Sequence, residues 1–433
     1  MQNPLQITKK NVHKPIFLQK EQSPAPIFSL IQHKFIPLQP KETINYETAM
    51  KNTRQTIIML AGLAVIGLSV LLGACRPTAS STGEPPVMLT QGKYPYATFF
   101  EGRYFFTSQP AADTIYLTAT ERLEDIAQAK PQAVWTPDTT GKFFHIWSPE
   151  LHRLRGAWYI YFEADDGNMD NHHLYVLENT NDDPLKGTWQ MKGVLRTNDE
   201  WNFGLHPTVL NTGSDLYLLW SGWPKRRTEI ETQCIYIARL DDPWTVGSER
   251  VMLSHPEYEW ELQWINPNGN RLAYPIYVNE NPEAFLTPDG RHVCICYSAS
   301  GIWTIYHVLG MLTAPASADL LDPASWTKSP EPLFTGIMAE EGSIDEKDTE
   351  AQEASTSRLA HQFTTLCGTS NICLVADAAT SRLITTDDGS HTPLLYEGMW
   401  FSSDETEHRA TFLGNVRWGD DGLPDFGKPA SIP

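Results

Sequence analysis

A pair of strand-like runs recurs along this chain, and that repeat constrains the fold more than any other feature. Each repeat has an aromatic-rich run, a loop and a second apolar run, and the repeats stand about 54 to 79 residues apart. The first runs begin at Arg103, Trp158, Leu216, His292 and Asn371. Gly, Asn, Asp and Pro separate the runs, and no long stretch keeps the 3.6-residue period of a helix. The pattern predicts an all-β fold, a five-bladed β-propeller, with a β-sandwich plus a β-rich appendage as the alternative.

The residues before this repeat have the order of a secretory signal. Residues 51–54 contain two cationic side chains, residues 57–72 are apolar, and small residues lead to Cys75. The end of this segment resembles a bacterial lipobox, which implies that Cys75 is lipidated and holds the mature protein on a membrane. A single transmembrane anchor is the alternative, although about 16 apolar residues are fewer than the roughly 20 that span a bilayer.

These features divide the chain into four segments. Residues 1–49 are predicted to be a disordered or mis-assigned leader, because a complete signal begins at Met50. Residues 50–75 are the signal peptide, residues 76–88 a linker rich in Ser, Thr, Gly and Pro, and residues 89–433 the β-propeller. We therefore expect an exported protein of the cell envelope, lipid-anchored on the periplasmic side or at the outer-membrane surface.

The charge balance argues against nucleic acid as a partner. The chain has 33 Lys and Arg against 52 Asp and Glu, a formal charge of −19. Because the first 75 residues are net basic, residues 76–433 carry −24. Such a field repels phosphate backbones. No cysteine or histidine pattern has zinc-site spacing, so no metal site or cofactor is predicted, while a central calcium or other ion stays open. We expect a monomer.

Apart from Cys75, five cysteines lie in the predicted domain, an odd number for an exported protein. Cys294 and Cys296 fall on the same face of a predicted strand and are poorly placed to bridge each other. Cys367 and Cys373 could close a hairpin. Buried, unpaired thiols are the favoured interpretation.

Three segments combine acids, aromatics and proline in a way that strand packing does not require. They are Phe144–His152, Asn202–Leu210 and Tyr277–Phe285. Each precedes an aromatic-rich run by a similar distance, so each is predicted to be the innermost strand of a blade. Because the innermost strands of a propeller direct their ends toward one central axis, residues far apart in the sequence should meet there.

From about Gly92 to Ser431 the chain resembles glycoside hydrolase family 43, and within it the exo-acting α-L-arabinofuranosidases. The matching stretches include Trp147–His152, Trp158–Gly167, Leu219–Trp223, Val278–Pro282 and Trp418–Pro429. The resemblance implies a five-bladed β-propeller that hydrolyses O-glycosidic bonds in arabinose- or xylose-containing polysaccharides. A pentose-containing polysaccharide or oligosaccharide is therefore the expected partner.

The resemblance also implies three catalytic positions. Members of the family use a base Asp, an Asp that tunes the acid, and a general-acid Glu for inverting hydrolysis. Glu280 stands at the acid position, Tyr94 at the base position and His206 at the tuning position. A phenol with a pKa of about 10 is a poor base near neutral pH, so turnover should be slow. A rewired Tyr94–His206 pair and a noncatalytic glycan-binding lipoprotein are the alternatives.

Further residues are expected at the substrate. Trp147, Trp223 and Trp303 are candidates for stacking on the apolar face of a sugar, with packing in the core as the alternative reading. Glu150 lies in the same stretch as Trp147 and is predicted to bind the substrate. By resemblance, His361 matches a histidine that the last blade of the family places at the axis.

Overall fold

The computed structural model describes residues 86–108, 113–138, 143–197, 203–225, 231–264, 275–302, 307–333, 369–401 and 407–427. All of them belong to one compact unit that ends at Pro433. Strands and short 3₁₀ helices make up the regular structure of these residues. The predicted leader, signal peptide and lipidation site Cys75 lie outside the described residues, and the first strand, β1 (Val87–Gln91), begins in the last residues of the expected linker. No helix among the described residues is long and apolar enough to cross a membrane.

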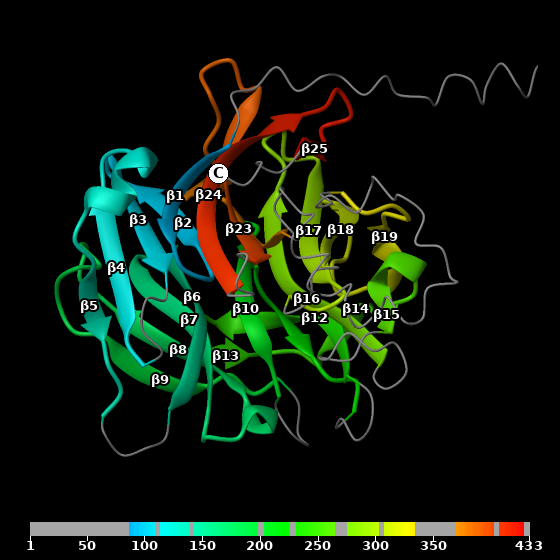
Figure 1. Cartoon of the computed structure of the whole chain (residues 1–433), viewed down its shortest axis with the longest axis horizontal. Coiled ribbons are helices and arrows are strands. Elements are labelled where there is room, and N and C mark those ends of the chain that lie inside the picture. The colour runs from blue at the N-terminus through cyan, green and yellow to red at the C-terminus, as the bar shows by residue number, and fades with distance from the viewer. Residues whose placement is uncertain are drawn as a thin grey trace, which may run out of the picture. The chain divides into compact units, whose positions relative to one another are not determined.

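The strands form five antiparallel blades (Figure 1), which confirms the predicted five-bladed β-propeller. Blade 1 contains β2 (Tyr96–Phe100), β3 (Arg103–Ser108), β4 (Ile115–Thr120) and β5 (Gln132–Trp135), with η1 (Leu123–Gln128) between its outer strands. Blade 2 contains β6 (Phe144–Leu154), β7 (Ala157–Asp165), β8 (His173–Asn179) and β9 (Gln190–Val194), with η2 (Met169–Asn171) after β7.

Blades 3 and 4 are joined by a short parallel pairing between β12 and β16. Blade 3 contains β10 (Leu205–Asn211), β11 (Leu216–Gly222), β12 (Glu231–Asp242), β13 (Thr245–Val246) and β14 (Val251–Ser254). Blade 4 contains β16 (Pro275–Leu286), β17 (His292–Ala299), β18 (Val308–Pro315) and β19 (Thr327–Lys328). The smaller elements here are η3 (Glu259–Glu261), β15 (Leu262–Trp264) and η4 (Pro323–Ser325).

Blade 5 closes the ring with strands from both ends of the described chain. It contains β20 (Thr369–Leu374), β23 (His391–Phe401), β24 (Glu407–Trp418) and, on its outer side, β1, with β25 (Pro424–Asp425) paired to β24. Figure 1 shows β1 in blue lying beside β24 in red. Between β20 and β23, β21 (Ala376–Asp377) and β22 (Arg382–Leu383) pair with β2 of blade 1. Because the first and last strands share a sheet, the ring does not open at its seam.

The fifth repeat is displaced by one strand from the prediction. In blades 1 to 4 the aromatic-rich runs are the second and third strands, whereas in blade 5 the run that starts at Asn371 is the innermost strand, β20. The third strand of that blade, β24, begins with the polar residues Glu407 and His408, so the sequence pattern did not identify it as a strand. The three segments predicted as innermost strands are confirmed as β6, β10 and β16.

Aromatic side chains fill the spaces between neighbouring blades. Each of five large apolar clusters in the described chain joins two blades, through side chains such as Trp158, Trp220, Tyr297, Tyr396 and Phe106. Fully burying one aromatic side chain removes about 150–250 Å² from water, so the aromatic content of the chain is explained by inter-blade packing. The free thiols of Cys234, Cys294, Cys296 and Cys373 are buried in the same clusters, as predicted, while Cys367 lies outside the described residues.

Candidate active site

A ring of strained backbone surrounds the propeller axis. Each innermost strand, or the two residues before it, carries at least one non-glycine residue with φ between 46° and 55°, and β6 carries a second one, His145. The other five are Tyr94, Ser148, His206, Asn281 and Asn371, and the first four of these are each followed by proline. A residue before proline normally avoids helical conformations, and a left-handed non-glycine residue costs on the order of 1–3 kcal/mol. Such residues persist where the surrounding structure holds them, and they cluster at functional sites.

Irregular strand pairing turns these residues out of their sheets. The register shifts between β6 and β7 at Trp147–Glu150, between β10 and β11 at Leu205–Thr208, and between β16 and β17 at Glu280–Glu283. A β-bulge of this kind re-aims a side chain that the regular ladder would direct to one face of the sheet.

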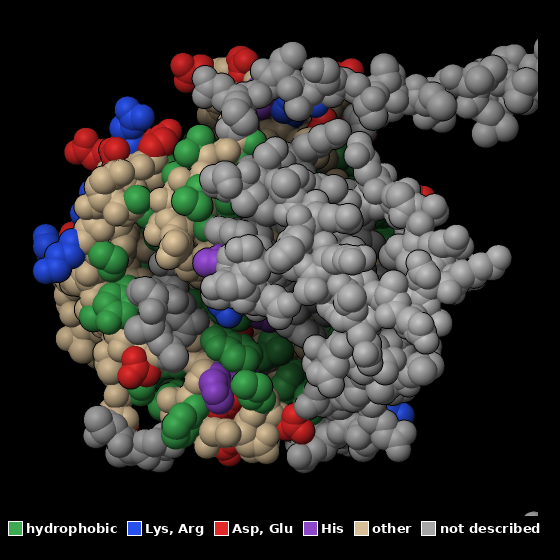
Figure 2. All heavy atoms as spheres, viewed as in Figure 1, with side chains coloured by type: hydrophobic (Ala, Val, Ile, Leu, Met, Phe, Trp, Pro, Cys, Tyr) green, Lys and Arg blue, Asp and Glu red, His purple; other side chains and the backbone are tan. Residues whose placement is uncertain are grey.

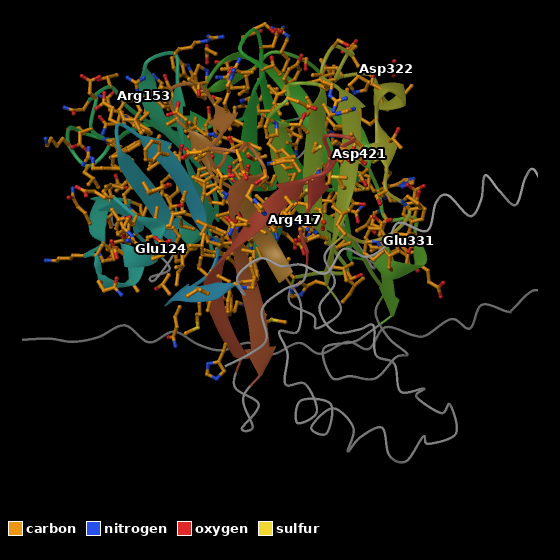
Figure 3. The ribbon with its side chains drawn as sticks, turned by 90° about the horizontal axis from the view of Figure 1, so that it is seen from above. Glu124, Arg153, Asp322, Glu331, Arg417 and Asp421 are labelled. Atoms are coloured by element: carbon orange, nitrogen blue, oxygen red, sulfur yellow. The ribbon has the colours of Figure 1, made fainter. Side chains whose placement is uncertain are left out.

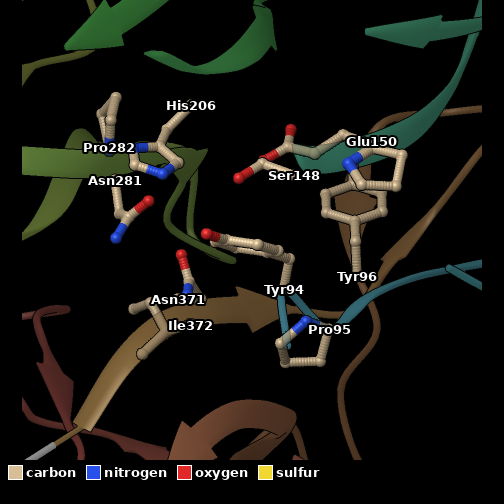
Figure 4. A pocket seen from close by; sticks show the side chains of 11 residues that line it. Tyr94, Pro95, Tyr96, Ser148, Glu150, His206, Asn281, Pro282, Asn371 and Ile372 are labelled. Atoms are coloured by element: carbon tan, nitrogen blue, oxygen red, sulfur yellow. The ribbon is translucent and has the colours of Figure 1, made fainter. Parts of the chain in front are cut away.

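These five left-handed residues all line one narrow pocket on the axis. Figure 4 shows the side chains of Tyr94, His206, Asn281 and Asn371 directed toward one another, with Glu150 to the right, beside Ser148. Every blade contributes to this lining through its innermost strand or the residues just before it. The predicted convergence of distant residues on one axis is therefore confirmed.

Glu280 is held in β16 by contacts on both sides. Its side chain is 1% exposed, and Oε1 accepts a hydrogen bond of 2.7 Å from the backbone N–H of Ile302. The backbone N–H of Asn281 donates to Oγ of Ser221 in blade 3, and Nδ2 of Asn279 donates to Oγ of Ser254. These contacts fix the Asn-Glu-Asn segment, so the Glu280 carboxyl group has a defined position at the axis.

A buried ion pair connects Tyr94 with the segment that contacts Glu280. Oε2 of Glu397 accepts from the backbone N–H of Tyr94 at 2.9 Å and from Nδ2 of Asn371 at 2.7 Å. The other oxygen of Glu397 pairs with Nη1 of Arg409, whose Nη2 donates to the carbonyl of Ile302 at 3.1 Å. Sequence reasoning missed Glu397 and Arg409, because both lie in outer strands without a motif.

The phenol of Tyr94 is protonated near neutral pH. Burial raises the pKa of Tyr94 well above its ordinary value, and the nearby carboxyl groups of Glu397, Glu163 and Glu280 raise it further. A neutral phenol donates a hydrogen bond and does not take up a proton. The structure therefore gives Tyr94 the chemistry of a donor at the position where the sequence suggested a missing base.

His206 lies beside Tyr94 and contacts a carboxyl group that the sequence did not single out. The two rings are 5.9 Å apart, and Nε2 of His206 is 3.6 Å from Oε1 of Glu163 in β7. Burial lowers the pKa of His206 to about 3, with a further decrease caused by His172. Burial raises the pKa of Glu163, which is 0% exposed, to about 8. At neutral pH both groups are therefore uncharged.

Two more carboxyl groups lie on the axis beneath this pair. Oε2 of Glu150 is 3.0 Å from Nε2 of His152, whose Nδ1 is 3.4 Å from the hydroxyl of Tyr96. Burial raises the pKa of Glu150 and of Glu283 well above the usual range, and Glu150 raises that of Glu283 further. Burial therefore favours the neutral forms of both carboxyl groups.

Aromatic and histidine side chains form one wall near the pocket. The indole of Trp147 stacks on the ring of His172 at 4.6 Å, and Oδ2 of Asp165 is 2.8 Å from Nδ1 of His145. Trp223 is 3% exposed and stacks on Phe203 at 3.8 Å. Figure 2 shows histidine side chains among hydrophobic ones on the face it presents.

The residues predicted to bind the substrate therefore differ in their exposure and in whether they line the pocket. Glu150 lines the pocket, and Trp147 is partly exposed. A sugar contact at Trp223 would require Phe203 and its neighbours to move, because that indole is almost fully buried. Trp303 and His361 lie outside the described residues. No group of three or more metal-ligating side chains is present among the residues that the structure describes.

The profile of glycosyl hydrolases family 43 matches residues 77–357. The chain belongs to this family. It is 38% identical over 240 residues to an extracellular exo-α-(1→5)-L-arabinofuranosidase of Streptomyces chartreusis, covering 54% of this chain and 68% of that one. It is 30% identical over 335 residues to α-L-arabinofuranosidase 43 of Humicola insolens, covering 76% of this chain and 60% of that one.

Solved structures of the family share the fold. The crystal structure of an α-L-arabinofuranosidase from Lactobacillus brevis superposes with a TM-score of 0.63 at 28% identity, over 80% of this chain and 96% of that one. A thermostable family 43 glycoside hydrolase gives a TM-score of 0.55 at 14% identity, which shows the fold alone.

Membership of family 43 identifies the chain as a glycosidase. The axial pocket is therefore the candidate site of hydrolysis. Two of the residues assigned by resemblance, Tyr94 and His206, line that pocket, and Glu280 directly precedes the lining residue Asn281. The catalytic roles of these residues remain predictions. Of the three positions, only that of Glu280 holds a carboxyl group.

Proposed function

We propose that this protein is a glycosidase that releases arabinofuranosyl units from arabinose-containing polysaccharides, with Glu280 as the general acid. The observation that supports it most is the position of Glu280: a buried carboxyl group, hydrogen-bonded to Ile302, beside an axial pocket to which all five blades contribute. A carboxylic acid in such surroundings can protonate the glycosidic oxygen as the C–O bond breaks.

The names of the family 43 relatives support the choice of sugar. Two of the curated relatives are extracellular exo-α-(1→5)-L-arabinofuranosidases, and the chain covers 68% and 69% of their lengths. Both of these relatives are named as exo-acting enzymes, which remove terminal sugars. We therefore favour exo-acting release of arabinose over internal cleavage.

The direct test measures arabinose release from arabinan and from an aryl α-L-arabinofuranoside by the wild-type protein. We expect release by the wild type from both substrates and, on arabinan, a loss of about 10² to 10⁴-fold in kcat with Glu280→Gln, the range that general acid catalysis supplies. Glu124→Gln is the control, because Glu124 lies on η1 with its side chain 53% exposed (Figure 3). A wild type without turnover on any pentose glycoside would contradict the proposal.

A noncatalytic glycan-binding protein is the second candidate. It is favoured by Tyr94 and His206, which stand where the family has carboxylates and are both uncharged at neutral pH. In that case arabino-oligosaccharides would bind without turnover. Hydrolysis by the double variant Tyr94→Asp, His206→Asp would then identify a decayed enzyme, and continued inactivity a dedicated binding protein.

We also propose that the protein is exported and attached to the cell envelope through a lipidated Cys75. The support is the cationic, apolar and small-residue order of residues 51–75 and the extracellular relatives. Incorporation of labelled palmitate into the wild type, and its loss in Cys75→Ala with release of the protein into the soluble fraction, would test this. Equal labelling of both proteins would contradict it.

A further inference from the structure

The family's base carboxylate is absent from this pocket, yet a different carboxyl group lies behind one of its walls. Glu163 comes from β7, a middle strand of blade 2, and its side chain is 0% exposed. Within the described part of the chain neither of its oxygens meets the geometry of a hydrogen bond, although the Ser148 side chain and the His206 backbone lie close enough to lower its pKa against the effect of burial. A buried polar group without partners costs about 1–3 kcal/mol or more, so its retention calls for an explanation.

The imidazole of His206 lies close to this carboxyl group. Oε1 of Glu163 is 3.6 Å from Nε2 of His206, and neither ring nitrogen has a hydrogen-bond partner in the described chain. His206 itself lines the axial pocket, next to Tyr94. The imidazole therefore stands between Glu163 and the space that a substrate would occupy, with Nδ1 left for a ligand or a water molecule.

We propose that His206, positioned by Glu163, accepts the proton of the attacking water and so replaces the missing base of the family. This inference rests on the proposed function. A carboxylate beside an imidazole selects one tautomer of the ring and stabilises the imidazolium that forms when the ring takes up a proton. In the proposed active state the 3.6 Å separation closes, so that the ionised Glu163 accepts from Nε2–H and counteracts the lowering of the His206 pKa by burial. The lone pair of Nδ1 is then left for the proton of the attacking water.

The step balances without any further reactant. The oxygen of water bonds to the anomeric carbon while the glycosidic C–O bond breaks. One proton of the water passes to Nδ1 of His206, and the carboxyl proton of Glu280 passes to the leaving oxygen. The products are the free sugar and the shortened glycan, and transfer of the proton from His206 to Glu280 through solvent restores the starting state.

The surroundings of Glu163 and His206 predict how kcat/KM depends on pH. The titratable groups that face it are His172 and Glu150 of blade 2, Tyr94 before β2, and Glu280 of β16. Burial raises the pKa of Glu163 to about 8, so Glu163 loses its proton as the pH rises through that value. Since the base needs Glu163 ionised, kcat/KM should rise through about pH 8.

The first experiment compares pH profiles on an aryl α-L-arabinofuranoside. We expect the rising limb near pH 8 in the wild type and its absence in Glu163→Gln, with a rate loss of about tenfold or more above pH 8. His206→Ala should lose about 10² to 10⁴-fold. Glu178→Gln, on the neighbouring strand β8 and paired with Lys192, is the control and should keep the wild-type profile.

Chemical rescue distinguishes a base from a residue that only supports the fold. Azide attacks without giving up a proton, so added azide should restore turnover in His206→Ala and Glu163→Gln, with glycosyl azide as product. The same azide should not rescue Glu280→Gln on a sugar leaving group. Variants that keep the wild-type rate above pH 8 without azide, or that azide does not rescue while they remain folded by circular dichroism, would overturn the inference.

A second measurement does not depend on turnover. In ¹⁵N-histidine-labelled protein, the ring nitrogens of His206 should shift with a midpoint near pH 8, and Glu163→Gln should abolish that transition. If the wild type is active but this titration is absent, the inference fails and the proposed function stands. A wild type without activity contradicts the proposed function and the base role together.

Discussion

The buried ion pair between Arg409 and Glu397 offers a sharp test of how the axis is held together. Glu397 is 0% exposed and the Arg409 side chain 7% exposed, and Glu397 also accepts from Tyr94 and Asn371. Replacing Arg409 with methionine keeps the aliphatic part of the side chain and removes the charge. Glu397 would then be a buried carboxylate with neutral donors only.

Removing one partner of a buried pair costs about 3–5 kcal/mol, because the remaining charge is left without compensation. Arg417→Met is the matched control, since Arg417 lies on the same strand, β24 (Figure 3), and pairs with Asp425 where the side chains are 30% and 45% exposed. An exposed pair contributes about 0–1 kcal/mol. We therefore expect Arg409→Met to lower the free energy of unfolding by at least 2 kcal/mol more than Arg417→Met.

Equilibrium unfolding in urea, followed by tryptophan fluorescence, measures both variants. The double variant Arg409→Met, Glu397→Gln should cost less than the sum of the two single changes, because the unpaired charge is then gone. Equal stabilities of Arg409→Met and Arg417→Met, or strict additivity in the double variant, would refute the reasoning.

Three further predictions concern the wall, the core and the thiols. Trp147→Ala should raise the Kd of arabino-oligosaccharides about tenfold by calorimetry, since its indole is partly exposed and stacked on His172; an unchanged Kd would remove it from the site. Gly310→Ala should destabilise the fold by about 1–3 kcal/mol in thermal unfolding, because a Cβ there would lie 2.3 Å from Cζ of Tyr297; an unchanged midpoint would contradict this. The thiols of Cys234 and Cys294, whose pKa burial raises to about 12, should react with a disulfide reagent only after unfolding, and rapid native labelling would contradict their burial.

The repeat in the sequence was enough to predict the blades, because the strands of each blade bury aromatic and apolar side chains against the two neighbouring blades. The repeat gave the wrong strand positions in the fifth blade. There the apolar run that starts at Asn371 is the innermost strand, β20, and the third strand, β24, begins with charged residues. Local composition does not say where a strand lies in its blade, since burial on both faces gives similar runs in the first and second strands.

Some of the residues at the propeller axis could be predicted from the sequence. Tyr-Pro, Ser-Pro, His-Pro and Asn-Pro dipeptides at 94, 148, 206 and 281 mark four of the five left-handed residues that line the axial pocket, and that recurrence is a signal that sequence reasoning can use. The sequence did not single out Glu163, which lies inside an aromatic run. Its proposed role depends on the 3.6 Å contact with His206, which joins blade 2 to blade 3. Such contacts depend on blade geometry, and no spacing in the sequence encodes them.

Glu280 is the residue on which the proposed hydrolysis depends most, as the acid that protonates the leaving oxygen. The measurement that tests it compares kcat/KM of Glu280→Gln on two substrates, an arabino-oligosaccharide and dinitrophenyl α-L-arabinofuranoside. A sugar leaving group needs protonation, whereas a dinitrophenolate leaves without it. We predict a loss of at least 10²-fold on the oligosaccharide and less than about tenfold on the dinitrophenyl substrate. Equal losses on both substrates, or no loss on the oligosaccharide, would contradict the account.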